Sequence, residues 1–369
     1  MEIGKYRSRE RVKELADRIG EICPSRDINI MEVCGTHTMA IARYGLRGLM
    51  PGRLRLISGP GCPVCVTPTS IINAAQNLSK TPGVVIATFG DMMRVPGTEK
   101  TLEERRAEGA DVRVLYSAYD LLSMAERETE KNFIFISVGF ETTTPGIALA
   151  VLETARRDLH NVFFLAANRL VIPALEALCA SEDIRIDGFL CPGHVSVIIG
   201  SDAYEPVVQQ FHVPCVVSGF EPVDILKAIY HLTVQIAGKA ARVENAYTRA
   251  VTAGGNRRAW EVIDRVFEPV DAEWRGIGSI PLSGLKLREK YAQFDALNKF
   301  DVELTPIPDP RGCRCGDVLK GLLIPPECPL FGSRCTPASP VGPCMVSSEG
   351  SCAAYYKYGT TGDEGAGNG

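Results

Sequence analysis

The sequence of 369 residues has no surplus of positive charge, no long apolar run and no leader-like start. Its formal net charge is −4, so it lacks the excess of cations that would neutralise a nucleic-acid backbone. No stretch approaches the roughly 18 uncharged apolar residues of a membrane-spanning helix. Residues 1–22 carry charge throughout, without the apolar core of a secretory signal. These absences predict a cytoplasmic protein that binds neither nucleic acid nor membrane.

Several motifs of nucleotide and metal sites are also missing. The loop at residues 139–145 lacks the Gly-Lys-Ser/Thr of a P-loop, so it does not indicate a nucleotide site. No C-x₃-C-x₂-C occurs, which disfavours radical S-adenosylmethionine chemistry. Paired C-x₂-C knuckles, which are typical of zinc ribbons, are absent as well.

The chain does contain an alternation of short apolar runs and helical patterns. A content of 45% hydrophobic and 23% charged residues fits a soluble globular protein, and the length suggests two or three domains. Strands are expected at Asn29–Val33, Leu54–Ile57, Val84–Phe89, Phe133–Val138, Val162–Ala166, Gly188–Cys191 and Cys215–Ser218. Helices are expected at Arg9–Ile22, Thr69–Leu78, Tyr119–Glu128, Gly146–Arg156, Ile172–Cys179 and Pro222–Ala237. The alternation predicts an α/β fold with parallel sheets.

A short internal similarity bears on the domain organisation. Ser58–Cys62 resembles Leu190–His194, and each follows an apolar run. Either two similar α/β domains meet near residue 130, or Gly/Pro turns recur by chance. We expect an N-terminal helix packed on the body (1–29), two parallel-sheet α/β domains (30–130 and 131–238), a mainly helical or irregular cysteine-rich domain (239–358) and a disordered tail (359–369).

The expected cysteine-rich domain begins where the strand pattern stops, near residue 240. Helical periodicity is present at Glu244–Val251, Arg258–Phe267 and Leu285–Asn298. Beyond these segments, residues 306–350 are rich in Pro, Gly and Cys and leave little room for regular structure. Something other than a hydrophobic core must therefore hold this part of the chain.

Six of the thirteen cysteines lie in this segment, namely Cys313, Cys315, Cys328, Cys335, Cys344 and Cys352. Thiolates are soft ligands, suited to zinc or to iron–sulfur clusters, and turns allow them to converge. Their spacing favours an iron–sulfur cluster, because paired knuckles are missing. Four cysteines complete a 4Fe–4S cubane, which leaves two for a redox-active pair. Zinc, or cysteines that are merely structural, are the alternatives.

Three further cysteines follow predicted strands, where the crevice at the carboxyl ends of a parallel sheet binds ligands. Cys34 and His37 are three residues apart and suit metal binding or an activated thiolate, although a core cysteine beside a helix cap is the alternative. Cys62 and Cys65 form a C-x-x-C, which suits a redox disulfide or metal capture better than packing alone. The dipole of the helix that begins near Thr69 would favour their thiolate forms.

Two more loops also follow predicted strands. Residues 139–145 suit an anion or substrate, with Thr hydroxyls and helix N–H groups available. N-capping by Thr144, with Pro145 at the first helical position, explains the same residues equally well. His194, in the Cys-Pro-Gly-His loop, is either an acid, base or ligand, or a partly buried structural histidine.

In their order and spacing these motifs resemble the HypD family of NiFe-hydrogenase maturation proteins. The similarity extends roughly from Met31 to Tyr358, and no motif residue of the family is missing. The stretches that carry it are Cys34–His37, Gly59–Cys65, Gly139–Thr143, Pro192–Ser196 and Pro340–Cys352.

The resemblance implies two similar α/β domains and a third domain that holds a 4Fe–4S cluster. The cluster ligands that it implies are Cys313, Cys328, Cys335 and Cys352. Cys315 and Cys344 would then be the redox-active pair. The residues implied for the cleft, where iron is held transiently, are Cys34, Cys62 and Cys65, with His37, His194 and Glu349 in support.

The resemblance also implies partners and a role. HypC, a small chaperone, would share the iron, and HypE would deliver cyanide that HypF makes from carbamoyl phosphate. The protein would act as a scaffold and redox participant in assembly of the Fe(CN)₂CO group, and not as a classical turnover enzyme. Two other functions stay open: an iron–sulfur thiol–disulfide reductase that uses Cys62 and Cys65, and a zinc-stabilised interaction protein.

Overall fold

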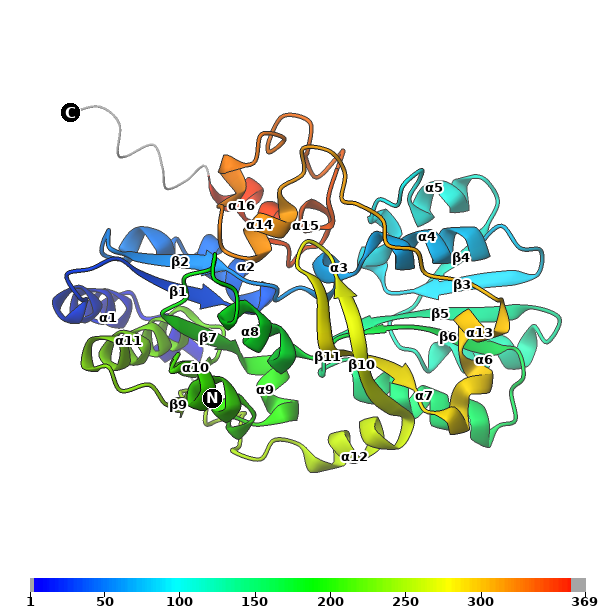
Figure 1. Cartoon of the computed structure of the whole chain (residues 1–369), viewed down its shortest axis with the longest axis horizontal. Helices are drawn as coiled ribbons and strands as arrows, with labels where there is room; N and C mark the ends of the chain where they lie inside the picture. Colours follow the sequence, from blue (N-terminus) through cyan, green and yellow to red (C-terminus); the bar gives the residue numbers. More distant parts are fainter. Residues whose placement is uncertain (1–2, 360–369) are drawn as a thin grey trace.

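The computed structural model describes residues 3–359, so the tail expected at 359–369 lies, apart from Gly359, outside the described residues. The fold is α/β, as predicted, with two parallel sheets side by side and a separate antiparallel hairpin (Figure 1). Among residues 3–359, none of the helices combines the length and apolar character needed to cross a bilayer.

Sheet A has five parallel strands in the order β2-β1-β7-β8-β9. They are β1 (Ile28–Glu32), β2 (Leu54–Ser58), β7 (Gly188–Pro192), β8 (Cys215–Ser218) and β9 (Val243–Asn245). Strand β1 pairs with β7 although the whole of the second sheet separates them in sequence, with Ile30 opposite Gly188. The strand order reverses between β1 and β7, and such a reversal opens a crevice at the carboxyl ends.

Sheet B has four parallel strands in the order β4-β3-β5-β6. They are β3 (Val84–Thr88), β4 (Asp111–Val114), β5 (Asn132–Gly139) and β6 (Val162–Asn168). Both faces of its central strand β5 are buried: Ile134 and Ile136 belong to one apolar core, and Phe133 and Phe135 to another. The order reverses between β3 and β5, so each sheet has one such crevice.

The strand pairing differs from the expected segments 30–130 and 131–238. Strand β5 pairs with β3, and β6 with β5, so neither is in the sheet of β7 and the expected second segment is divided between the two sheets. The similar loops at Ser58–Cys62 and Leu190–His194 both belong to sheet A. They are therefore loops of one sheet, two strands apart, and not equivalent positions in two domains.

Sixteen α-helices are present in residues 3–359. They are α1 (Arg9–Ile22), α2 (Gly35–Arg43), α3 (Pro63–Val66), α4 (Thr69–Leu78), α5 (Leu102–Ala107), α6 (Asp120–Arg127), α7 (Thr144–Arg156), α8 (Val171–Cys179), α9 (Gly193–Ile199), α10 (Glu205–Phe211), α11 (Pro222–Gly238), α12 (Arg257–Val266), α13 (Ala296–Lys299), α14 (Cys315–Leu319), α15 (Pro343–Val346) and α16 (Ser351–Tyr358). The expected helices at Arg9–Ile22 and Thr69–Leu78 are confirmed at both ends. Helix α1 packs on α11 at the edge of sheet A (Figure 1).

Of the three helices expected after residue 240, Arg258–Phe267 corresponds to α12 and Glu244–Val251 is wrong, because residues 243–245 form β9. The third, Leu285–Asn298, begins in a strand and continues as a 3₁₀ helix (Glu289–Phe294) and α13. The strand belongs to an unexpected hairpin made by β10 (Phe267–Trp274) and β11 (Gly278–Leu287). Strand β10 contains Pro269, a residue that is rare inside a sheet. The proline is tolerated because β10 pairs with a strand on one side only.

The C-terminal segment, from α14 to α16, lies over the region between the two sheets (Figure 1). Helix α16 packs on α2, and α15 packs on α3. At Gly276 and Gly316 the hairpin turn and α14 approach so closely that a Cβ built on Gly316 would lie 2.7 Å from the Cα of Gly276. Gly276 has a φ of +74°, which only glycine adopts readily.

The contact between Gly276 and Gly316 gives a first prediction. We expect Gly316→Ala to destabilise the protein by roughly 1–3 kcal/mol, because the new methyl group meets backbone that cannot move aside. Gly20→Ala is the control: Gly20 lies exposed in α1 with nothing near its Cβ position, and the change should stabilise by about 0.5–1 kcal/mol. Urea unfolding of the two variants under anaerobic conditions measures both effects. Equal stability of the two variants would contradict the close contact.

Candidate functional site

A pocket lies where the carboxyl ends of the two sheets meet the C-terminal segment. We call it the inter-sheet pocket. Its volume of about 320 Å³ is at the lower end of the range of small-ligand sites. Its lining comes from three parts of the chain: Cys62, Pro63 and Val64 after β2; Phe89, Gly90, Asp91, Met92, Val138 and Thr143 from sheet B; and Ser347, Ser348 and Glu349. Cys62 and Glu349 were predicted site residues, and Thr143 belongs to the loop at residues 139–145 that was expected to suit an anion or substrate. Asp91, which follows the predicted strand Val84–Phe89, was not predicted.

The C-x-x-C is built on the four-residue helix α3. Cys62 is the N-cap, and its Sγ accepts a hydrogen bond from the Cys65 N–H at 3.2 Å. The Cys65 thiol donates to Cys62 Sγ, and the two sulfur atoms are 2.6 Å apart. Cys65 is fully buried, and burial raises the pKa of its thiol well above the ordinary value. The expectation that the dipole of the helix at Thr69 keeps Cys65 as a thiolate is therefore wrong. Cys65 lies in the separate helix α3, and no cation within residues 3–359 compensates its burial.

Buried thiols connect the C-x-x-C to the C-terminal cysteines. The Cys344 side chain interacts with Cys65 on one side and with Cys315 on the other. Cys315 in turn interacts with Cys313 and Cys352. Cys344 is completely buried, and Cys315 is 5% exposed. An uninterrupted row of sulfur atoms therefore leads from the inter-sheet pocket into the C-terminal segment.

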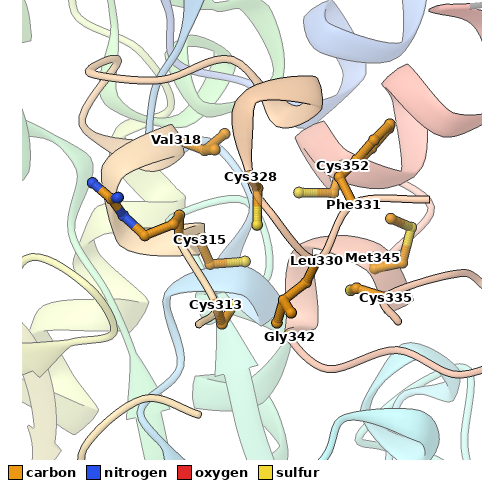
Figure 2. A pocket seen from close by; sticks show the side chains of 11 residues that line it. Cys313, Cys315, Val318, Cys328, Leu330, Phe331, Cys335, Gly342, Met345 and Cys352 are labelled. Carbon is orange, nitrogen blue, oxygen red and sulfur yellow. The ribbon is translucent and has the colours of Figure 1, made fainter. Parts of the chain in front are cut away.

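The C-terminal segment contains a second pocket, which is lined mainly by thiols and apolar side chains. Figure 2 shows the sulfur atoms of Cys315, Cys328 and Cys352 directed toward a common space. The cysteines that line it are Cys313, Cys315, Cys328, Cys335 and Cys352. Its apolar walls include Val318, Leu330, Phe331 and Met345. We call it the cysteine pocket.

The donors of the cysteine pocket fit an iron–sulfur cluster. Thiolates in an apolar shell are the usual ligands of such clusters, and four are needed. Five cysteines line the pocket, and the sixth, Cys344, lies outside it against Cys65. Among residues 3–359, no three His, Cys, Asp or Glu side chains are arranged around a single metal ion. A cubane does not require such an arrangement, because each of its four ligands binds a different iron atom.

Cys34 lies beside Glu349, one of the residues that line the inter-sheet pocket. Gly35, the first residue of α2, lies so close to Glu349 that a Cβ would be 2.4 Å from the Glu349 Cβ. The Thr36 hydroxyl donates to Glu349 Oε1 at 2.7 Å. Burial, and then the negative charge of Glu349, raise the pKa of the Cys34 thiol to about 11. Cys34 is therefore protonated at neutral pH unless a metal ion or another cation replaces its proton.

The two predicted histidines flank one aromatic ring. His37 and His194 pack on Phe220, with ring centroids 4.8 and 4.1 Å from it. Burial lowers the pKa of His37 to about 4, and its Nε2 lies 2.9 Å from the Gly219 carbonyl oxygen. Since a neutral imidazole must donate that bond from Nε2, its Nδ1 carries the free lone pair, and Nδ1 is buried without a partner among the described residues.

Comparison with known proteins assigns this architecture to a family. The family model named HypD, described as "Hydrogenase formation hypA family", matches residues 10–359. The chain belongs to the HypD family. The hydrogenase maturation factor HypD of Azotobacter vinelandii is 44% identical over 366 residues, which cover 97% of this chain and 96% of that protein. The resemblance inferred from the motifs is thus confirmed.

Two further relatives, from other organisms, are similarly close in sequence. The hydrogenase maturation factor HypD of Escherichia coli is 42% identical, with 96% of this chain and 97% of that protein covered. A putative hydrogenase expression/formation protein of Methanocaldococcus jannaschii is 43% identical, with 94% and 97% covered. The match extends over nearly the full length of each relative, so the cysteine-rich segment is included as well as the two sheets.

One motif loop of this HypD-family chain differs from its expected geometry. Thr144 does not cap α7: it is buried, donates to the Phe140 carbonyl oxygen at 2.9 Å and belongs to the helix itself. Glu141 is also buried, and its Oε1 accepts the Val171 N–H at 2.9 Å. Burial raises the pKa of Glu141 to about 7. Glu141 therefore holds the loop through a buried hydrogen bond with the Val171 backbone, while Thr143 lines the inter-sheet pocket.

The contact between Cys34 and Glu349 in this HypD-family chain gives a second prediction. We expect Glu349→Gln to lower the pKa of Cys34, because it removes the negative charge that opposes ionisation. Each unit by which the pKa falls increases the thiolate fraction, and hence alkylation at pH values below the pKa, about tenfold. Iodoacetamide labelling, quantified on the Cys34 peptide by mass spectrometry over a pH series, measures the shift. Glu103→Gln in exposed α5 is the control, and an unchanged pH profile for Glu349→Gln would contradict the prediction.

Proposed function

We propose that this HypD-family protein is the scaffold and electron-supplying component in assembly of the Fe(CN)₂CO group of NiFe-hydrogenases. The observation that carries the proposal is the row of buried thiols from Cys62 and Cys65 through Cys344 to Cys315. It joins a pocket suited to a ligand-carrying partner with a pocket suited to an iron–sulfur cluster. Membership of a family of hydrogenase maturation factors supports the same role.

The cysteine pocket would hold the 4Fe–4S cluster. We propose Cys313, Cys328, Cys335 and Cys352 as its ligands, and Cys315 with Cys344 as the redox pair. Support comes from Cys344, which contacts Cys65 and does not line the pocket, and from Cys315, which contacts both Cys344 and the pocket. When bound, the cluster would supply single electrons to this pair.

The C-x-x-C would deliver electrons to the substrate side. Release of cyanide from a thiocyanate carrier breaks an S–C bond and consumes two electrons and one proton, giving a free thiol and cyanide. Oxidation of Cys62 and Cys65 to a disulfide supplies both electrons, and one of the two released protons goes to the carrier sulfur. Thiol–disulfide exchange with Cys344 and Cys315 then restores the dithiol. Their contacts place each sulfur beside the next one in this sequence.

The iron that receives cyanide and carbon monoxide is the substrate of this assembly. Soft thiolates from Cys34, Cys62 and Cys65 would hold ferrous iron transiently. His37 and His194 would support it with their neutral imidazoles, and Glu349 by its charge beside Cys34. These residues do not surround a single ion by themselves, so we propose that HypC completes the coordination.

We propose HypC and HypE as the two partners. HypE would bring the thiocyanate carrier to the inter-sheet pocket, where Asp91, Thr143 and Ser347 offer polar contacts. Ser347 donates to Asp91 Oδ2 at 3.0 Å, which joins the C-terminal segment to the loop after β3. A carrier bound there would contact both sheets and the segment that contains the cluster ligands.

The 2.6 Å approach of Cys62 and Cys65 also suits a second function, an iron–sulfur thiol–disulfide reductase. Such an enzyme would reduce a protein or small disulfide catalytically, without iron at Cys34. The two functions differ in what the inter-sheet pocket binds. Iron carrying cyanide and carbonyl ligands favours assembly, and turnover of a disulfide without such iron favours the reductase.

Metal content gives a third prediction. We expect an anaerobic preparation to be brown, with roughly four iron and four sulfide per chain, because the clustered thiolates bind a cubane. Additional iron with infrared bands from cyanide and carbonyl would support transient iron in the inter-sheet pocket. A colourless protein with zinc and no sulfide would contradict the electron-supply proposal and favour a zinc-stabilised interaction protein.

The redox pair gives a fourth prediction. We expect Cys344→Ser and Cys315→Ser to keep the brown cluster but to lose ligand loading, since the row of thiols is interrupted between the cluster and Cys65. Cys23→Ser is the control, because Cys23 caps α1 far from both pockets. Iron and sulfide analysis with infrared spectroscopy of the HypC complex measures both properties. Normal loading in either variant would contradict the relay, and loss of the cluster in Cys315→Ser would make Cys315 a ligand.

A further inference from the structure

Arg275 is a buried cation between the hairpin of β10 and β11 and the C-x-x-C helix α3. It follows β10, is 4% exposed, and donates from its backbone N–H to the Val66 carbonyl oxygen at 2.9 Å, next to the C-x-x-C. Its Nε bonds to Asp309 Oδ1 at 2.7 Å. Its Nη1 and Nη2 are buried and have no hydrogen-bond partner among residues 3–359.

Such a guanidinium is costly unless an anion faces it. Buried polar groups are almost always hydrogen-bonded, and an unmatched buried charge is more expensive still. Asp309 accepts a hydrogen bond from only one of the three guanidinium nitrogen atoms of Arg275. It lies on the side that is open to solvent, because the Asp309 side chain is 29% exposed and the Arg275 side chain 2%. The inward side of the guanidinium therefore lacks its counter-charge.

The backbone connects Arg275 to the segment that contains the cysteine pocket. The neighbouring residue, Gly276, is in backbone contact with Gly316, which directly follows Cys315. The charge of Arg275 also interacts with the Cys313 side chain. Arg275 thus lies within electrostatic range of a residue proposed to bind the cluster.

We propose that Arg275 is the counter-charge of the iron–sulfur cluster and sets its reduction potential. The proposal rests on the cluster proposed above. Reduction adds a negative charge to a site that already carries thiolates, and a cation in a low-dielectric interior stabilises the reduced form more than the oxidised one. Arg275 would then make the cluster easier to reduce, and its backbone bond to Val66 would keep it beside the helix that receives the electrons.

Redox titration of the holoprotein, followed by electron paramagnetic resonance, tests the proposal. We expect Arg275→Gln to lower the reduced fraction at a fixed potential at least tenfold, which corresponds to a shift of about 59 mV toward negative potential for a one-electron couple. Arg275→Lys keeps the charge and should keep most of the potential. Arg311→Gln removes an exposed charge from the segment just before Cys313 and should leave the potential unchanged, because solvent screens it.

Asp309→Asn gives a second, opposite test that does not depend on folding of the Arg275 variant. Removal of its carboxylate leaves the charge of Arg275 uncompensated, so the potential should become more positive. Full iron and sulfide content with an unchanged potential in both Arg275→Gln and Asp309→Asn would overturn the proposal. Absence of iron and sulfide from the unsubstituted protein would instead overturn the cluster, and this proposal with it.

Discussion

The contact between Cys65 and Cys344 is the interaction on which the rest of the site depends. Each cysteine lies on a helix of four residues that begins with proline, and each is fully buried. The two helices pack against each other, and a close glycine contact supports α15: a Cβ on Gly350 would lie 2.1 Å from the Cys344 carbonyl oxygen. With two such short helices held face to face, the C-x-x-C and the cysteine pocket become parts of one site.

Burial determines the chemistry of these thiols. Desolvation raises the pKa of Cys34 and Cys65, so neither is a free thiolate at neutral pH. Exposed nucleophilic cysteines usually have lowered pKa values, and this site shows the reverse. Protonated, solvent-shielded thiols suit a path in which electrons move together with protons, and soft-metal binding in which the metal displaces the proton.

The two sheets contribute different groups to the inter-sheet pocket. Sheet A supplies Cys62 to the lining, and Cys34 and the two histidines lie at the starts of the helices that follow β1 and β7. Sheet B supplies Asp91 and Thr143 from the segments that follow β3 and β5. Each sheet reverses its strand order near these segments, and that reversal creates room for a ligand. The C-terminal segment contributes Ser347, Ser348 and Glu349 to the same lining.

The sequence by itself determined the fold class and seven of the nine strands of the two sheets, because strand periodicity is a local property. Motif spacing, which is also local, supplied the candidate site residues. The sequence did not reveal which strands share a sheet: β1 pairs with β7 across the whole of sheet B, and pairing partners are chosen by packing over long sequence distances. The hairpin of β10 and β11 was missed because Pro269 and a bulge after Val270 weaken its pattern. The contact of Cys344 with Cys65, and the place of Arg275 beside the C-x-x-C helix α3, were decided only by tertiary structure. Both arise where segments far apart in the chain pack together, and no local pattern encodes them.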